Sequence, residues 1–143
     1  MDDQRRLVAL WHARGRGILG LVCIVFPGLV AGASMGRPGP VGRAAVRMLG
    51  VRDIALGLGA ISGIREGGPT EEWIGWGAVA DGVDAAALLL TRGLPVRARL
   101  AGLFAAGSAV YGYRTARAFA DARTAAAAEA EAAAEAFAVD PTA

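Results

Sequence analysis

Long apolar stretches, separated by short segments rich in Pro, Gly or charge, dominate the first 113 residues of the chain. The first stretch, residues 17–36, runs for 20 positions without a charged side chain. As a helix it is long enough to cross the ~30 Å hydrocarbon core of a bilayer, although Pro27 should kink it. Three further stretches follow, and together they predict an all-α, integral membrane four-helix bundle: residues 44–64, 73–91 and 94–113.

The second of these helices must carry charge into the bilayer. Its uncharged run, residues 54–64, has 11 positions and is too short to cross by itself. Residues 65–72 are charged and glycine-rich and block extension at one end, so the helix must reach back to about Ala44. This length requirement places Arg52 and Asp53 near the middle of the helix.

The third helix carries Asp81 and Asp84, which share one face because they are three residues apart. If residues 65–72 form the turn between the second and third helices, both charged pairs lie at similar distances from that turn. At ~1.5 Å per residue, all four side chains lie roughly 14 to 20 Å deep. We therefore expect Arg52, Asp53, Asp81 and Asp84 to meet near the bilayer centre.

A cluster of this composition has two interpretations. Arg52 can donate a forked pair of hydrogen bonds to one carboxylate while Asp53 accepts from its own side. Three acids against one arginine in a low dielectric predict at least one bound proton, on Asp81 or Asp84. The cluster is either a buried ionic clamp that fixes helix pairing or a polar pocket for an anion, a proton or a small polar ligand.

Glycines spaced for helix packing occur in the first and second helices. Small residues four positions apart let the backbones of two membrane helices approach closely. The glycines expected at such contacts are Gly28, Gly32, Gly57, Gly59 and Gly63.

The formal charge of +2 hides an asymmetry along the chain. Residues 1–16 form a basic N-terminal segment, whereas residues 114–143 form an acidic, Ala-rich tail of high helix propensity, expected to be a helical extension in solvent. With the N terminus in the cytoplasm, the inner segments collect eight arginines and the outer segments five. The positive-inside rule then predicts cytoplasmic N and C termini. All 15 basic residues are Arg, a bias typical of GC-rich bacteria. Together with the four predicted spans, this composition leads us to expect a multi-pass protein of the bacterial inner membrane.

Several kinds of site are excluded by what the sequence lacks. Cys23 is the only cysteine, so an intrachain disulfide and a multi-thiolate metal site are excluded. His12 is the only histidine, which argues against a bis-histidine haem, a zinc site or a Ser-His-Asp triad, and no metal site or cofactor is expected. The spacing of Gly15, Gly17 and Gly20 matches a dinucleotide fingerprint, but no strand precedes it. The arginines lack the interleaved aromatic residues of a nucleic-acid surface, so no nucleic acid is expected as a partner.

Two alternative interpretations of the hydrophobic pattern stay open. The first apolar stretch follows a basic flank and contains Ala31-Gly32-Ala33, which is similar to a signal-peptidase site. The acidic residues at positions 2 and 3 and the spans that follow weigh against a cleaved leader. A soluble helical bundle is the other alternative, because charges lie inside the second and third stretches.

Two motifs carry a resemblance to a known family. The sequences RMLGVRDIALGLG, at residues 47–59, and WIGWGAVADGVDAAALLL, at residues 73–90, resemble small actinobacterial membrane proteins grouped under a domain of unknown function. The similarity covers roughly residues 15–113. It implies four spans, with a Leu-Gly-x-Arg-Asp element in the second and a Trp…Asp-x-x-Asp element in the third, but no activity. The layout is also similar, more distantly, to DoxX-like membrane proteins.

The sequence therefore predicts a non-enzymatic membrane protein with a structural or accessory role. Its partners would be the lipid bilayer and either a second copy of the chain or another membrane protein. One alternative is a small transporter subunit or ligand-binding membrane protein that uses the charged cluster. Another is the anchor or subunit of a membrane redox enzyme, with the cofactor supplied by a partner.

Overall fold

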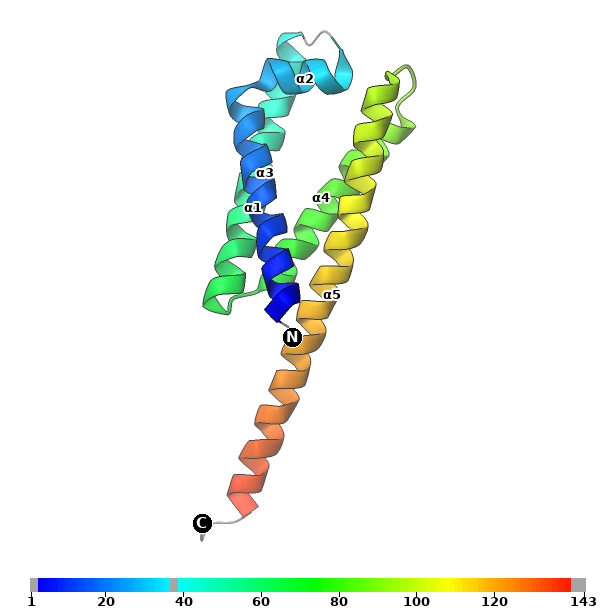
Figure 1. The fold of residues 1–143 in the computed structure, drawn as a ribbon. Coiled ribbons are helices and arrows are strands. Elements are labelled where there is room, and N and C mark those ends of the chain that lie inside the picture. The colour runs from blue at the N-terminus through cyan, green and yellow to red at the C-terminus, as the bar shows by residue number, and fades with distance from the viewer. Residues whose placement is uncertain (1–2, 37–38, 140–143) are drawn as a thin grey trace.

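The computed structural model describes residues 3–36 and 39–139, which contain five helices and no strand (Figure 1). The all-α prediction is confirmed for these residues. The helices are α1 (Asp3–Val25), α2 (Pro27–Met35), α3 (Pro40–Glu66), α4 (Thr70–Leu90) and α5 (Val96–Val139).

Proline and glycine set several of the helix boundaries. Pro27 has no N–H to donate and its ring clashes with the preceding turn, so α1 ends before it and α2 begins there. Pro40 likewise opens α3, where the missing N–H costs nothing. At the other end of α3, Gly67 adopts a left-handed conformation with φ of 75° and donates its N–H to the Gly63 carbonyl at 3.0 Å.

The four long helices form two antiparallel pairs. In one pair α1 lies along α3, in the other α4 lies along α5, and a short turn joins α3 to α4 (Figure 1). The short helix α2 crosses one end of the first pair. The start of α1 lies beside α5 at the other end, and α5 continues far beyond the bundle (Figure 1). The two pairs are closest near the α3–α4 turn and diverge toward α2.

The interior is built from small side chains and the surface from large ones. Val46 is the only large side chain that is fully buried among the described residues. The other buried apolar residues are mostly alanines, for example Ala9, Ala31 and Ala98. Large apolar side chains instead point outward along every helix, among them Ile18, Leu29, Met48, Leu58, Val83, Leu100 and Phe104. Soluble domains bury such residues, so this distribution is inverted relative to theirs.

Several boundaries differ from those expected. The expected first span, residues 17–36, is not one helix, because Pro27 divides it, and the helix before the break extends back to Asp3 through the basic segment 1–16. Residues 96–113 and the tail up to Val139 form one 44-residue helix, α5, because no Pro or Gly occurs between Gly112 and Val139. The last four residues of the tail and residues 37 and 38 lie outside the described part of the chain.

Two helices, α1 and α4, are long and apolar enough to cross a membrane. Both have mostly exposed side chains: 22% and 28% of their most apolar windows are buried. The second and fourth predicted spans correspond to α3 and α5. Neither of these helices contains a segment as apolar as those of α1 and α4, because they carry charges or have a lower hydropathy.

Candidate functional site

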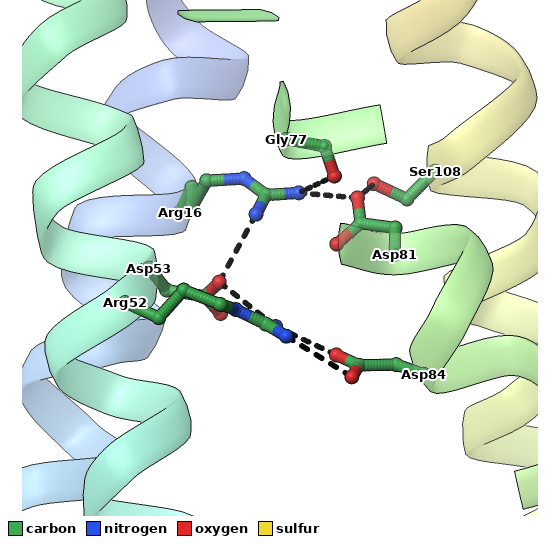
Figure 2. A network of polar contacts seen from close by, with 7 residues as sticks. All are labelled: Arg16, Arg52, Asp53, Gly77, Asp81, Asp84 and Ser108. Atoms are coloured by element: carbon green, nitrogen blue, oxygen red, sulfur yellow. Dashed lines mark hydrogen bonds and ion pairs between the residues drawn. The ribbon is translucent and has the colours of Figure 1, made fainter. Parts of the chain in front are cut away.

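A network of charged side chains lies in the centre of the bundle (Figure 2). Its inner part is built around Arg16, which extends from α1 between α3 and α4. Arg16 donates from Nη1 to Asp53 Oδ1 of α3 at 3.0 Å, and its Nη2 pairs with Asp81 Oδ2 of α4. Nη2 also donates to the Gly77 carbonyl at 3.4 Å. One guanidinium therefore bridges two helices that face it from different sides.

The outer part of the network is an arginine–aspartate fork. Arg52 of α3 donates from Nη1 to Asp84 Oδ1 at 3.0 Å and from Nη2 to Asp84 Oδ2 at 2.6 Å (Figure 2). Two parallel bonds of this kind fix both the distance and the orientation of the two helices. Nη2 also lies 3.3 Å from Asp53 Oδ1, which links the fork to Arg16.

The fourth long helix joins the network through a hydroxyl group. Ser108 of α5 donates from Oγ to Asp81 Oδ2 at 2.6 Å. The same carboxylate oxygen accepts from Arg16, so α1, α4 and α5 meet at one atom. With Asp53 and Arg52 on α3, each of the four long helices contributes at least one side chain, and the network therefore crosslinks the whole bundle (Figure 2).

The inner and outer parts differ in burial. The side chains of Arg16, Asp53 and Asp81 are 10 to 12% exposed, whereas those of Arg52 and Asp84 are 32% and 27% exposed. Among described residues, the Nε–H of Arg52 is the one buried side-chain donor without an acceptor. The network holds two guanidiniums and three carboxylates, so with all groups ionised it carries one negative charge in excess.

The four charged residues singled out in the sequence, Arg52, Asp53, Asp81 and Asp84, all lie in this network. Arg16 is not among the residues predicted from the sequence, because the predicted first helix begins at residue 17. The signal available was Trp11, an aromatic residue typical of membrane interfaces; had it marked the start of the span, residue 16 would have fallen inside. The added guanidinium reduces the carboxylate excess on which the expected bound proton depends, and that proton stays a prediction.

The five glycines expected at helix contacts have different surroundings. A Cβ on Gly57 would lie 2.8 Å from the Ala13 carbonyl, one on Gly63 would lie 2.8 Å from Thr70 Oγ1, and one on Gly59 would overlap the Trp73 ring. These three positions have no room for a larger residue. A Cβ on Gly28 would make only ordinary contact with Arg43, and Gly32 accepts the N–H of Gly36 within the last turn of α2.

A close approach of α1 and α3 involves a glycine pair that the sequence analysis did not identify. A Cβ on Gly20 would lie 2.5 Å from the carbonyl oxygen of Gly50, and a Cβ on Gly50 would lie 2.5 Å from that of Gly20. The two backbones therefore touch where both residues lack a side chain. The pair lies between Arg16 and the α1–α2 break, and it sets the spacing from which Arg16 and Asp53 reach each other.

A small cavity of about 20 Å³ adjoins the inner part of the network. Arg16, Asp81, His12 and Tyr111 are among its lining residues, and the rings of the last two lie 4.9 Å apart. This space fits about one water molecule with polar partners. No group of three His, Cys, Asp or Glu side chains in the described ranges is arranged to hold a metal ion. The site is therefore a set of ion pairs with room for water rather than a large binding pocket.

Comparison of the chain with protein-family models, with curated proteins and with solved structures finds no match. The resemblance to the actinobacterial membrane family consequently stays a prediction that depends on its two sequence motifs.

Proposed function

We propose that the chain is a four-span protein of the bacterial inner membrane and that the charged network is the structural joint between its two helix pairs. The spans in this proposal are α1, α3, α4 and the first part of α5. The inverted distribution of side chains supports it. Lipid solvates large apolar side chains such as Ile18 and Val83, which are 64% and 62% exposed, whereas water would not.

Aromatic side chains support one boundary of the membrane in this proposal. Trp11, Trp73 and Tyr113 are exposed and come from three different helices. The contact between His12 and Tyr111 places α1 and α5 at the same level there, and Ile74 packs with the alanines around residues 9–13. Trp and Tyr concentrate at the boundary between hydrocarbon and headgroups. The start of α1 and the tail of α5 then emerge on one side, which matches cytoplasmic termini.

The role of the charged network as a structural joint follows from the free-energy cost of placing charge in lipid. A charged side chain at the centre of a membrane helix costs about 2.5 to 3.5 kcal/mol on insertion scales. Five such side chains in one bundle are tolerated only if they satisfy one another. The ion pairs Arg16–Asp81 and Arg52–Asp84 are the charged contacts between the two pairs, in the part of the bundle where the pairs diverge. Near the α3–α4 turn the pairs also pack directly, with Trp73 against Gly59 and Ile74 against the alanines of α1. This bridging is the observation that carries the proposal.

The proposal is tested by separating insertion from helix pairing. The full chain should remain in the membrane fraction after an alkaline wash, as should the double variant Arg16→Met/Arg52→Met, since that variant removes only cations. Introduced cysteines at Ala13 and Ala78, which line the same cavity from opposite pairs, should crosslink in the parent chain and much less in the variant. Equal crosslinking in the parent chain and in the variant would contradict the role of the network as the joint between the helix pairs. Recovery of the parent chain without detergent would contradict the membrane assignment.

A proton-binding site is a second candidate, favoured by the excess carboxylate and by the cavity beside Asp81. In this alternative the excess charge is neutralised by a proton that water in the cavity can exchange. Infrared spectroscopy of the reconstituted protein should then show a protonated carboxyl band at neutral pH that disappears in Asp81→Asn or Asp84→Asn. A purely structural joint with all carboxylates ionised shows no such band. The two infrared results differ only in the protonation of the network. In both cases we propose a non-enzymatic, accessory role for the chain, which acts by itself or together with a membrane partner protein.

A further inference from the structure

A groove of about 530 Å³ lies between the start of α1 and α5, at the end of the bundle where the tail emerges. Figure 1 shows these two segments side by side. The groove is separate from the charged network, and its size is within the usual range for small-molecule sites. One or two turns of each helix line the groove. The lining residues are Gln4, Arg5 and Val8 of α1 and Tyr111, Arg114, Thr115, Ala118 and Phe119 of α5.

The polar part of the groove is positively charged. Arg5 and Arg114 line it from opposite helices, both are exposed, and neither forms an ion pair with a carboxylate of the described residues. No Asp or Glu of the described chain is among the lining residues. The hydroxyl of Thr115 adds a further donor beside the two guanidiniums. Guanidinium groups bind phosphate oxygens through forked hydrogen bonds, so this arrangement suits a phosphate.

The apolar part of the groove continues into the surface that faces lipid in our proposal. Val8 is 47% exposed, and the neighbouring Leu7 and Val110 are each 54% exposed. Arg5 lies six residues before Trp11 and Arg114 directly follows Tyr113, so both arginines lie just outside the aromatic level, at the depth of headgroups. A ligand with a phosphate next to hydrocarbon chains fits both parts at once.

We infer that this groove binds the headgroup of an anionic phospholipid from the leaflet on the side of the termini. Arg5 and Arg114 hold the phosphate from two sides, and Val8 contacts the first carbons of the acyl chains. The inference rests on the proposed membrane location. A soluble phosphate compound would contact only the arginines and leave the apolar wall of the groove uncovered. An acidic peptide would also leave this apolar wall uncovered.

Native mass spectrometry of the full chain, released from vesicles of phosphatidylcholine and phosphatidylglycerol in equal amounts, tests the inference. The parent chain should retain phosphatidylglycerol in preference to phosphatidylcholine. Arg5→Gln/Arg114→Gln should weaken that preference on the order of tenfold, because the variant removes the charge-assisted hydrogen bonds that these two guanidiniums make to one phosphate. The matched control is Arg65→Gln/Arg117→Gln, which removes the same charge at the same end of the bundle but outside the groove. The control should keep most of the preference.

Each result has a distinct meaning. Equal loss in the two double variants would overturn the site and leave only a general attraction of positive charge to the membrane. Displacement of the lipid by inorganic phosphate at matched concentration would assign the groove to a soluble anion instead. Failure of the parent chain to enter the vesicles at all would contradict the proposed membrane location, whereas normal insertion without lipid preference would overturn this inference alone.

Discussion

The contact between α1 and α3 and the contact between the two helix pairs use opposite chemistry. In the first, the backbones touch at Gly20 and Gly50, where neither residue has a side chain to separate them. In the second, the helices diverge and the long side chains of Arg16 and Arg52 span the distance to Asp81 and Asp84. Few large apolar side chains are buried at either contact: Val46 packs beside the first, and Ile64 and Ile74 pack with alanines between the pairs near the α3–α4 turn.

This difference is the one expected of a helix bundle in lipid, the location that we propose for the chain. Lipid removes the hydrophobic drive to bury Leu or Ile between helices, so close backbone packing and polar contacts remain as the attractive forces. Close packing needs helices that are nearly in contact over several turns, as α1 and α3 are. Ion pairs act at longer reach, and their strength rises as water is excluded. The predictions below separate these two contributions.

Removal of Arg16 should have the largest effect. Arg16→Met keeps the length of the side chain but leaves the carboxylates of Asp53 and Asp81 buried without their shared cation. Breaking a buried pair in this way costs about 3 to 5 kcal/mol of unfolding free energy. Reversible unfolding in mixed micelles measures it, with Arg14→Met, which removes a cation stacked on Trp11, as the control. The loss should shrink at acidic pH, because protonated carboxyl groups need no cation; a loss independent of pH would contradict this cause.

A methyl group at Gly50 should disturb the other type of contact. In Gly50→Ala the new Cβ would lie 2.5 Å from the Gly20 carbonyl, so α1 and α3 must separate, at a cost of about 1 to 3 kcal/mol. Gly15→Ala, with nothing within 4 Å of the new Cβ, should instead stabilise its helix slightly. The same unfolding assay compares them, and equal effects of the same sign would show that the close approach is unimportant.

The outer fork should contribute less than Arg16, because about a third of Arg52 is exposed. A double-mutant cycle of Arg52→Gln and Asp84→Asn isolates the pair, and its coupling free energy should be about 1 kcal/mol. The double variant should be more stable than the sum of the two single losses implies. Strict additivity would indicate that Arg52 and Asp84 do not interact across the two helix pairs.

The ion pair between Arg123 of α5 and Glu71 of α4, with an N–O distance of 2.5 Å, should have the smallest effect. The Arg123 side chain is 62% exposed, and pairs in water contribute about 0 to 1 kcal/mol, which salt screens further. Arg123→Ala should therefore lower stability slightly at low salt and not at all at high salt. A loss as large as that of Arg16→Met would place this region in a low dielectric as well.

The sequence predicted the cluster of four charged residues because a short turn between two helices fixes the relative depth of their side chains. Counting from residues 65–72 was enough to bring Arg52, Asp53, Asp81 and Asp84 to one level. Arg16 could not be found this way, since no short turn relates α1 to α4 and the uncharged run appeared to begin after it. The Gly20–Gly50 contact depends on which faces of α1 and α3 meet, and spacing within one helix does not specify this.

The helical state of the tail was predictable from its composition, but its continuity with the fourth expected span was not recognised. Residues 113–139 contain neither Pro nor Gly, so nothing in them ends a helix once it has begun. The break at Pro27 was expected only as a kink. With α2 on the far side of the break crossing the end of the bundle, the first apolar stretch supplies two helices rather than one.

The accessibility of two introduced cysteines tests most directly whether lipid surrounds the bundle. In a Cys23→Ala background, Val83→Cys places a thiol on the exposed apolar face of α4, and Glu129→Cys places one on the exposed tail of α5. With the protein in lipid nanodiscs, where both faces of the bilayer are open to reagent, a charged maleimide should label position 129 rapidly and leave position 83 unreacted until denaturation. Equally rapid labelling of both thiols would contradict the account.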